Sequence, residues 1–232
     1  MFGHGFVLHR GEKMSKSLGN VVDPLGLADA FGVDQLRYFL LRDVSFGQDG
    51  SYSAEAIVAR CNADLANSFG NLAQRTLSFI AKNCGGVLPS GGKTDPADDA
   101  LRATVRGAGE EVCRLWEELA LSPGIEAWLR AVFACNQYID AQAPWSLRKT
   151  DPERMTAVLA TLVQAIRDLA ILIRPVIPGS ADRLLDQIGI PQGERGVAAL
   201  GNAESYARLV TSGVTLAPPT PIFPKLELPA DA

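Results

Sequence analysis

The architecture of this chain is first visible in residues 54–82, AEAIVARCNADLANSFGNLAQRTLSFIAK. Apolar side chains recur there mostly every three or four residues, which places them along one face of a helix. They are Ile57, Cys61, Leu65, Phe69, Leu72, Leu77 and Ile80. Ser53 is suited to cap this helix at its start, and the glycines after Cys84 are suited to end it. The stretch therefore predicts one long helix with a core-facing stripe.

Helix starts of one kind recur along the rest of the chain. A capping residue stands directly before a proline at Asp23-Pro24, Asp95-Pro96, Ser122-Pro123 and Asp151-Pro152. Each pair is followed by an apolar helical pattern, and Asp34 is expected to cap a further short helix. Residues 6–8 predict a short strand, but strand-like alternation is nearly absent after residue 50. We therefore predict a mainly α protein, an antiparallel helical bundle.

Three parts are expected along the sequence. Residues 1–50 hold a lysine-rich loop and short helices, and residues 51–190 form the helical bundle. Residues 191–232 are expected to be irregular, because the apolar pattern weakens after Gly189. A proline-rich tail follows, with Pro218, Pro219, Pro221 and Pro224, and proline cannot sustain a helix.

Composition narrows the classes of protein to be considered. The net charge of −4 argues against non-specific adhesion to nucleic acid but leaves room for a local binding site. Neither a signal peptide nor an apolar run of roughly 18–20 residues is found, so a cytoplasmic protein without a membrane span is expected. The four cysteines show no C-x-x-C pairing, so no metal site is expected either.

Residues 11–18, GEKMSKSL, form a loop suited to phosphate. Lys13 and Lys16 stand three residues apart, and lysine ammonium groups act as point charges on phosphate oxygens. Gly11 and Gly19 stand on either side of the two lysines and leave the backbone between them free to move. We therefore expect a mobile, phosphate-binding loop, whereas an isolated K-x-x-K would more often be a solvated turn.

Asn71 and Arg75 lie four residues apart, so they share one helix face. Both side chains can address base edges, although such a pair is more often an exposed polar face. Pro144 breaks a later helix and sets the direction in which Trp145 projects. That indole could stack on an unpaired base, a contact that contributes roughly 1–3 kcal/mol, or it could pack beneath the next helix.

The other two tryptophans are expected to belong to the core. Trp116 and Trp128 lie inside helical patterns, where an aromatic residue is usually part of the core. We therefore expect both to be buried in the core.

Several segments together resemble the methionyl-tRNA synthetases. KMSKSLGNVVDP at 13–24 resembles the second signature of class I aminoacyl-tRNA synthetases, and alone it would also fit the isoleucine, valine or leucine enzymes. FGQDGSYS at 46–53, NLAQR at 71–75 and QAPW at 142–145 are closer to the methionine family. The resemblance therefore implies the C-terminal part of a bacterial methionine–tRNA ligase, which activates methionine with ATP and Mg²⁺ and attaches it to tRNA(Met).

The resemblance also implies a fold and a set of site residues. The bundle would be of the class I synthetase anticodon-binding type, preceded by the lysine loop and stem-contact helices. Lys16 and Lys13 would be catalytic, within an ATP-binding loop of Lys13, Met14, Ser15, Lys16 and Ser17. The CAU anticodon would be contacted by Asn71, Arg75 and Trp145, supported by Pro144 and Asp140.

One part of the family pattern is missing. A class I active site also needs a HIGH signature, and neither His4 nor His9 begins one. We therefore expect a fragment that is inactive alone. No additional RNA-binding and dimerisation module follows the proline-rich tail, so a monomer is expected. Two alternatives stay open. One is a non-catalytic helical RNA-binding or scaffolding module derived from such an enzyme, and the other is a fragment of the isoleucine, valine or leucine enzyme.

Overall fold

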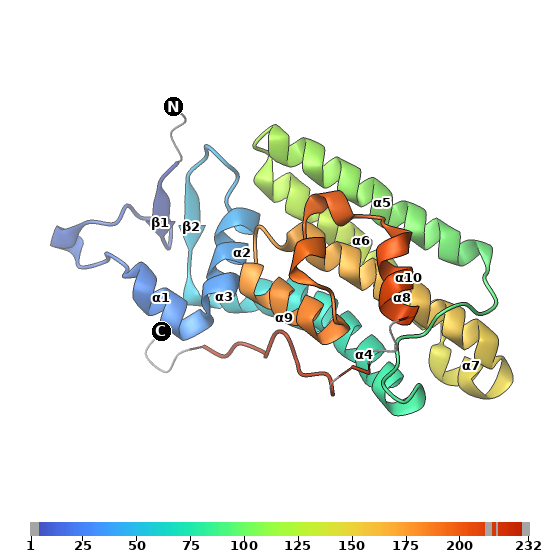
Figure 1. The fold of residues 1–232 in the computed structure, drawn as a ribbon. Coiled ribbons are helices and arrows are strands. Elements are labelled where there is room, and N and C mark those ends of the chain that lie inside the picture. The colour runs from blue at the N-terminus through green and yellow to red at the C-terminus, as the bar shows by residue number, and fades with distance from the viewer. Residues whose placement is uncertain (1–4, 212–214, 217, 229–232) are drawn as a thin grey trace.

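Two short strands and two short helices form one end of the molecule (Figure 1). The structure, a computed structural model, describes residues 5–211, 215–216 and 218–228. Strand β1 (Val7–His9) pairs in parallel with β2 (Gly50–Tyr52), and between them lie the lysine loop, α1 (Pro24–Phe31) and α2 (Val33–Asp43). The short strand expected at residues 6–8 is thus confirmed, one residue later. Its partner was not predicted, because three residues are too few to show alternation.

The long helix is present, with an irregularity that the sequence analysis missed. It consists of α3 (Ala54–Cys61), a π-helical segment (Asn62–Gly70) and α4 (Asn71–Asn83). Its first four apolar positions recur every four residues, and an α-helix of 3.6 residues per turn would rotate such a stripe away from the core. The wider π turns compensate for this drift. Every residue of the predicted stripe is consequently at most 2% exposed.

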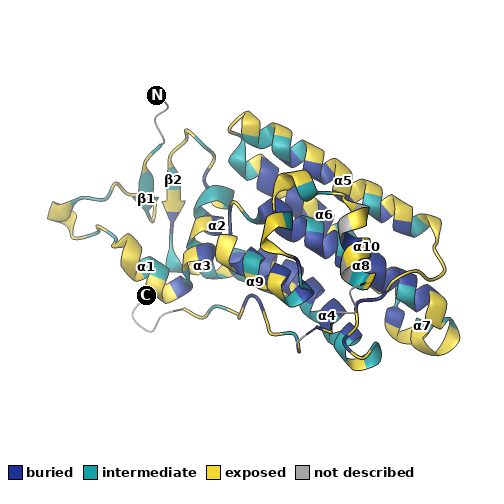
Figure 2. Ribbon diagram, viewed as in Figure 1, coloured by how far each residue is buried: buried dark blue, intermediate teal, exposed yellow. Residues whose placement is uncertain are grey.

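The bundle is completed by helices that pack around α8, as the mainly α prediction required. In chain order they are α5 (Pro96–Glu117), α6 (Leu121–Gln142), α7 (Pro144–Thr150), α8 (Pro152–Ile173) and α9 (Pro178–Ile188). Helix α8 contacts α4, α5, α6, α7 and α9. It is long and apolar enough to resemble a membrane span, but 83% of its most apolar stretch is buried inside the bundle. Figure 2 shows buried residues on the inward faces of α6 and α8 and exposed ones along α5.

Most of the predicted helix caps are confirmed. The carboxylates of Asp23, Asp95 and Asp151 accept hydrogen bonds from backbone N–H groups in the first turns of α1, α5 and α8. Each cap satisfies a donor that would otherwise lack a partner at the helix end. The cap-plus-proline pattern therefore located these helix starts correctly.

Two predicted caps have other roles. Helix α2 begins directly after Gly32, and the Asp34 carboxylate instead accepts from the backbone N–H groups of Gly179 and Ser180, in the first turn of α9. Ser122 lies inside α6, and its hydroxyl donates to the carbonyl oxygen of Arg42. In both cases a tertiary contact replaces the local one.

The C-terminal segment is more ordered than the sequence analysis expected, because it includes helix α10 (Ala203–Thr211). The proline-rich tail then runs back beneath α9 towards α1 (Figure 1). Phe223 is buried against Phe69, and the Asn62 side chain both donates to and accepts from the backbone of Leu226, at 2.9 and 2.8 Å. The described part of the tail, residues 218–228, is therefore anchored to the long helix without forming a helix or strand.

Trp128 lies in the core, as predicted. This side chain is fully buried, and its indole N–H donates to the carbonyl oxygen of Leu169 at 3.0 Å. Phe69 packs edge-on against it with ring centroids 5.1 Å apart. Trp116 is only partly buried, at the edge of the core between α5 and α6.

Candidate nucleic-acid interface and lysine loop

Arg75 and Trp145 lie side by side at one end of the bundle, although they are 70 positions apart in the sequence. The guanidinium carbon of Arg75 is 5.5 Å from the centroid of the Trp145 ring, within the range of a cation–π contact. Asp140 accepts a hydrogen bond from Arg75 Nη2 at 2.6 Å. The Trp145 side chain is 45% exposed, so it is not part of the core. The structure thus brings three of the predicted residues together.

An open pocket of about 230 Å³ adjoins this group. Pro144 forms part of its wall as the first residue of α7, and Phe79 adds an apolar surface. The complete lining consists of Arg75, Ser78, Phe79, Lys82, Asn83, Ile139, Pro144 and Trp145. The pocket combines flat and apolar groups with cations, which is the combination that an unpaired nucleotide requires.

The chain turns sharply where Trp145 is presented. Helix α6 ends at Gln142, and Ala143 has a left-handed backbone with φ of 43° and ψ of 62°. Pro144 then starts α7, so this proline opens a new helix, whereas the sequence analysis expected it only to end the previous one. The left-handed residue separates the two helices, and Trp145 lies in the first turn of α7 beside Arg75 of α4.

Asn71 lies one helical turn before Arg75 on α4 and is exposed. It lines a different pocket, of about 380 Å³, together with Asn67, Gln74 and Lys225. The structure therefore places Asn71 beside the Arg75–Trp145 group without joining the two pockets.

Five of the eight lining residues were not predicted as site residues from the sequence, among them Lys82 and Asn83. Lys82 stands seven positions after Arg75, so the helical period would have placed it on the same face of α4. Asn83 accepts a hydrogen bond from Arg148 Nη1 at 2.6 Å, which ties the end of α4 to α7. That contact depends on the tertiary fold, and no local signal indicates it.

The lysine loop is held in a turn by Asn20. The Asn20 side chain accepts from the backbone N–H of Ser15 at 2.8 Å and donates to the carbonyl oxygen of Lys13 at 3.1 Å. Ser15 Oγ accepts from the backbone N–H of Leu18 and lies 3.1 Å from Ser17 Oγ. The loop thus has a defined hydrogen-bonded conformation, which the sequence analysis did not anticipate, and its mobility stays a prediction.

The two lysines of this loop are exposed to solvent. Lys13 Nζ lies 4.7 Å from the centroid of the Phe6 ring. Among the residues that the structure describes, neither ammonium group has a carboxylate within 4.0 Å. Both cations are therefore available to an anion that approaches from solvent. Met14 is partly buried against the core, so it anchors the loop and leaves the lysines outside.

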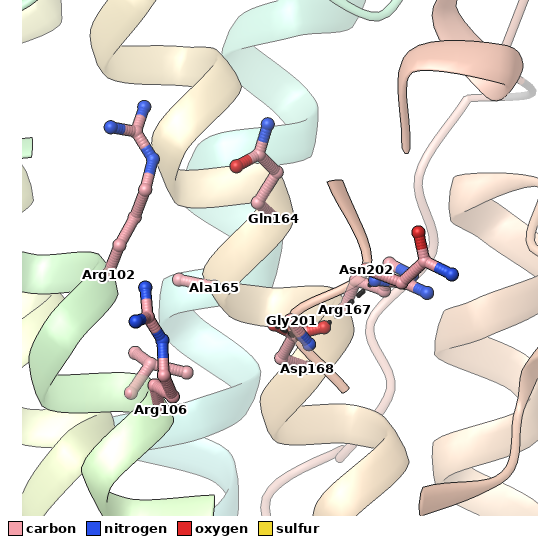
Figure 3. A pocket seen from close by; sticks show the side chains of 9 residues that line it. Arg102, Arg106, Gln164, Ala165, Arg167, Asp168, Gly201 and Asn202 are labelled. Atoms are coloured by element: carbon pink, nitrogen blue, oxygen red, sulfur yellow. Dashed lines mark hydrogen bonds and ion pairs between the residues drawn. The ribbon is translucent and has the colours of Figure 1, made fainter. Parts of the chain in front are cut away.

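A further pocket lies between α5, α8 and the segment before α10 (Figure 3). It measures about 140 Å³, and its polar side chains largely serve the fold. The Asp168 carboxylate accepts from the backbone N–H of Gly201, and Arg167 Nη2 donates to the carbonyl oxygen of Ala199. Burial raises the pKa of Asp168. These contacts fasten the segment to α8, far from the lysine loop in the sequence.

Comparison with known families agrees with this geometry. Residues 88–230 match the family described as the anticodon binding domain of methionyl tRNA ligase. The chain belongs to the methionyl-tRNA ligase family. Residues 1–77, which include the lysine loop and Arg75, match the family described as tRNA synthetases class I (M). The resemblance stated from the sequence is confirmed.

Individual relatives support the same assignment. The methionine–tRNA ligases of Brucella suis and Mycobacterium tuberculosis strain H37Rv are both 48% identical to this chain, over 97% and 99% of its length. The M. tuberculosis methionyl-tRNA synthetase solved in complex with methionyl-adenylate superposes with a TM-score of 0.87 over 95% of the chain, at 48% identity. The chain spans only 43% to 44% of the curated relatives and 43% of that solved chain.

Proposed function

We propose that this chain binds tRNA(Met) and recognises its CAU anticodon at the Arg75–Trp145 corner. The observation that carries the proposal is the half-exposed Trp145 ring with the Arg75 fork beside it, at the edge of an open pocket. An unpaired base requires a stacking plane together with donors for its edges. Proteins that read single-stranded RNA supply both from neighbouring side chains, as these two residues can.

The residues of the corner have different roles in this proposal. Trp145 supplies the stacking plane, and Arg75 supplies donors whose direction is set by the Asp140 carboxylate. Pro144 fixes the start of α7 and therefore the position of the indole. Asn71, one turn earlier on α4, offers a donor and an acceptor to a neighbouring base.

We propose a second role, in catalysis, for the lysine loop. The chain is part of a methionine–tRNA ligase that activates methionine with ATP and then attaches it to tRNA(Met). Lys13 and Lys16, within the loop of Met14, Ser15 and Ser17, contact the triphosphate and stabilise the charge that develops on the leaving pyrophosphate. Two exposed ammonium groups without carboxylate partners among the described residues fit this task. Mg²⁺ bound to ATP would neutralise further phosphate charge.

The protein acts in the cytoplasm, and the chain is monomeric.

A comparison of two tRNAs tests the RNA-binding part. Filter binding is measured with the same tRNA carrying either CAU or an altered anticodon, at a fixed salt concentration because phosphate contacts are salt-dependent. We expect tighter binding to CAU, and we expect the preference to disappear in Trp145→Ala and Arg75→Ala. Equal and weak binding of both tRNAs to the unaltered chain would instead favour the scaffolding module.

A further inference from the structure

Gln142, the last residue of α6, is tied to a buried ion pair beneath the Trp145 corner. Its side-chain oxygen accepts a hydrogen bond from Arg154 Nη2 at 2.7 Å. The same guanidinium forms a bidentate pair with Asp98, with both N–O distances at 2.6 Å. Arg154 is 7% exposed and Asp98 is fully buried. The hydrogen bond thus joins the end of α6 to the buried Asp98–Arg154 ion pair.

The Asp98–Arg154 ion pair is held in place by residues of three helices. Asp98 belongs to the first turn of α5, Tyr138 to α6 and Arg154 to the first turn of α8. The Tyr138 hydroxyl donates to Asp98, and Arg154 also donates to the carbonyl oxygen of Lys93 at 3.2 Å. A planar guanidinium engaged in this way has little freedom to rotate. Gln142 is therefore bonded to a group that cannot follow it if α6 shifts.

Gln142 stands three positions before Trp145, with only Ala143 and Pro144 between them. Ala143 has a left-handed backbone, which persists for a residue with a side chain only where the surroundings enforce it. A hydrogen bond on each side of Ala143, called a tether below, holds the turn in this conformation. The Gln142–Arg154 hydrogen bond precedes the turn, and the Arg148–Asn83 hydrogen bond follows it at the end of α7.

We infer that Gln142 and Arg154 are positioning residues that set the orientation of the Trp145 ring for base stacking. This inference rests on the proposed RNA-binding function. Neither residue touches the RNA; their effect is transmitted through the backbone of Ala143 and Pro144. Loss of the Gln142 tether allows the turn to relax, and the indole then leaves the position beside Arg75 in part of the population.

The first experiment uses the free protein. The indole N–H resonance of Trp145 is followed by NMR in Gln142→Met, which keeps the side-chain length but removes the acceptor, and in Gln142→Glu, which keeps it. Gln164→Met on α8 is the matched control. We expect Gln142→Met alone to shift the Trp145 signal, while the Trp128 signal stays in place in all variants because its indole is bonded inside the core. An unchanged Trp145 signal in Gln142→Met would overturn the inference without involving RNA.

The second experiment measures affinity for tRNA carrying CAU. We expect Gln142→Met to weaken binding about threefold to tenfold, in the range of one ordinary intramolecular hydrogen bond. Gln142→Glu should restore the affinity. Adding Gln142→Met to Trp145→Ala should cause no further loss, because the two act through the same ring.

The two proposals fail in different ways. If Trp145→Ala weakens binding but Gln142→Met does not, or if the two losses are additive, the positioning role is wrong and RNA binding stands. If Trp145→Ala has no effect on binding, the proposed anticodon site is wrong. The positioning role for RNA then falls with it, whatever the NMR signal shows.

Discussion

Among single residues, Asp98 should make the stability of this protein sensitive to acid. Burial alone would raise the pKa of its carboxyl group, but hydrogen bonds from Arg154, Tyr138 and the backbone of Asp95 outweigh burial and hold the pKa below its ordinary value. The unfolded chain therefore takes up this proton at a higher pH than the folded chain does. The stabilisation is complete above the ordinary aspartate pKa of about 3.9 and is lost as the pH falls through the folded value.

We predict that the free energy of unfolding decreases below about pH 4, and that Asp98→Asn removes part of this pH dependence. At neutral pH the same variant should be less stable by about 3–5 kcal/mol, because Arg154 stays buried without its countercharge. Urea unfolding at pH 7 and pH 3 measures both effects. Parallel pH profiles for the two proteins would contradict the prediction.

Two tryptophans should respond to substitution in opposite ways. Trp145→Ala should weaken tRNA binding by about 1–3 kcal/mol and change the melting temperature little, because the ring is half exposed. Trp128→Phe should lower the melting temperature, since it leaves a void and removes the buried hydrogen bond from the indole to the Leu169 carbonyl. The folded Trp128→Phe protein should keep its anticodon preference. Thermal unfolding and filter binding of both variants check this prediction. If Trp145→Ala lowers the stability as much as Trp128→Phe does, Trp145 is a core residue and the prediction is wrong.

How far single residues could be predicted depended on where their partners lie in the sequence. Arg75 and Trp145 were found because short motifs carry them, and Asp140 because the family resemblance implied it. The structure places the three together. Asn20 was missed, since its role is to bond backbone groups of a loop whose shape the sequence does not reveal. The tether from Arg154 to Gln142 joins two helices and leaves no local pattern.

At the scale of helices, the packing of α5 against α6 depends on a glycine. A Cβ atom on Gly124 of α6 would lie 2.2 Å from Nε1 of Trp116 on α5. That indole donates to the carbonyl oxygen of Leu121 at 3.2 Å, so it cannot move without losing a hydrogen bond. We predict that Gly124→Ala lowers the melting temperature although alanine is the better helix former.

Gly107 provides the matched control for that variant. It lies inside α5 with open space around its Cα, so Gly107→Ala adds no contact and should raise stability by about 0.5–1 kcal/mol. Thermal unfolding of both variants separates crowding from helix propensity. If the two substitutions change the melting temperature in the same direction, the contact with Trp116 does not limit how closely α5 and α6 approach.

Helix starts were predictable because capping is local, and the aspartate-proline pairs mark α1, α5 and α8. Other elements depend on distant parts of the chain. The three-residue strand β2 exists because β1 lies beside it, and the tail is ordered by Asn62 and Phe69. The π-helical segment was missed because its four-residue spacing was taken as an approximate α-helical period. The spacing of four residues, in place of the 3.6 residues of an α-helical turn, was the signal that could have revealed the π-helical segment.

At the scale of the whole molecule, the two candidate sites are built on opposite parts of one framework. The lysine loop precedes α1, and the Trp145 corner lies where α4 and α7 meet. The long helix connects them, since α3 packs against α2 and α4 carries Arg75. This arrangement places two exposed lysines at one end of the bundle and the half-exposed Trp145 ring at the other, as the proposed binding of one long RNA to both sites would require.

The same arrangement leads to a prediction about catalysis by the chain alone. Lys13 and Lys16 can stabilise phosphate charge, but formation of methionyl-adenylate also requires the carboxylate of methionine to be held in line with the α-phosphate of ATP. The chain spans 43% of the relatives to which it is similar, so we expect that task to need sequence beyond this chain. Methionine-dependent pyrophosphate exchange should therefore not exceed the control without protein. Binding of tRNA carrying CAU by the same preparation would show that the protein is folded. Exchange above the control that disappears in Lys16→Ala would mean that the lysine loop and its surroundings form a complete activation site by themselves.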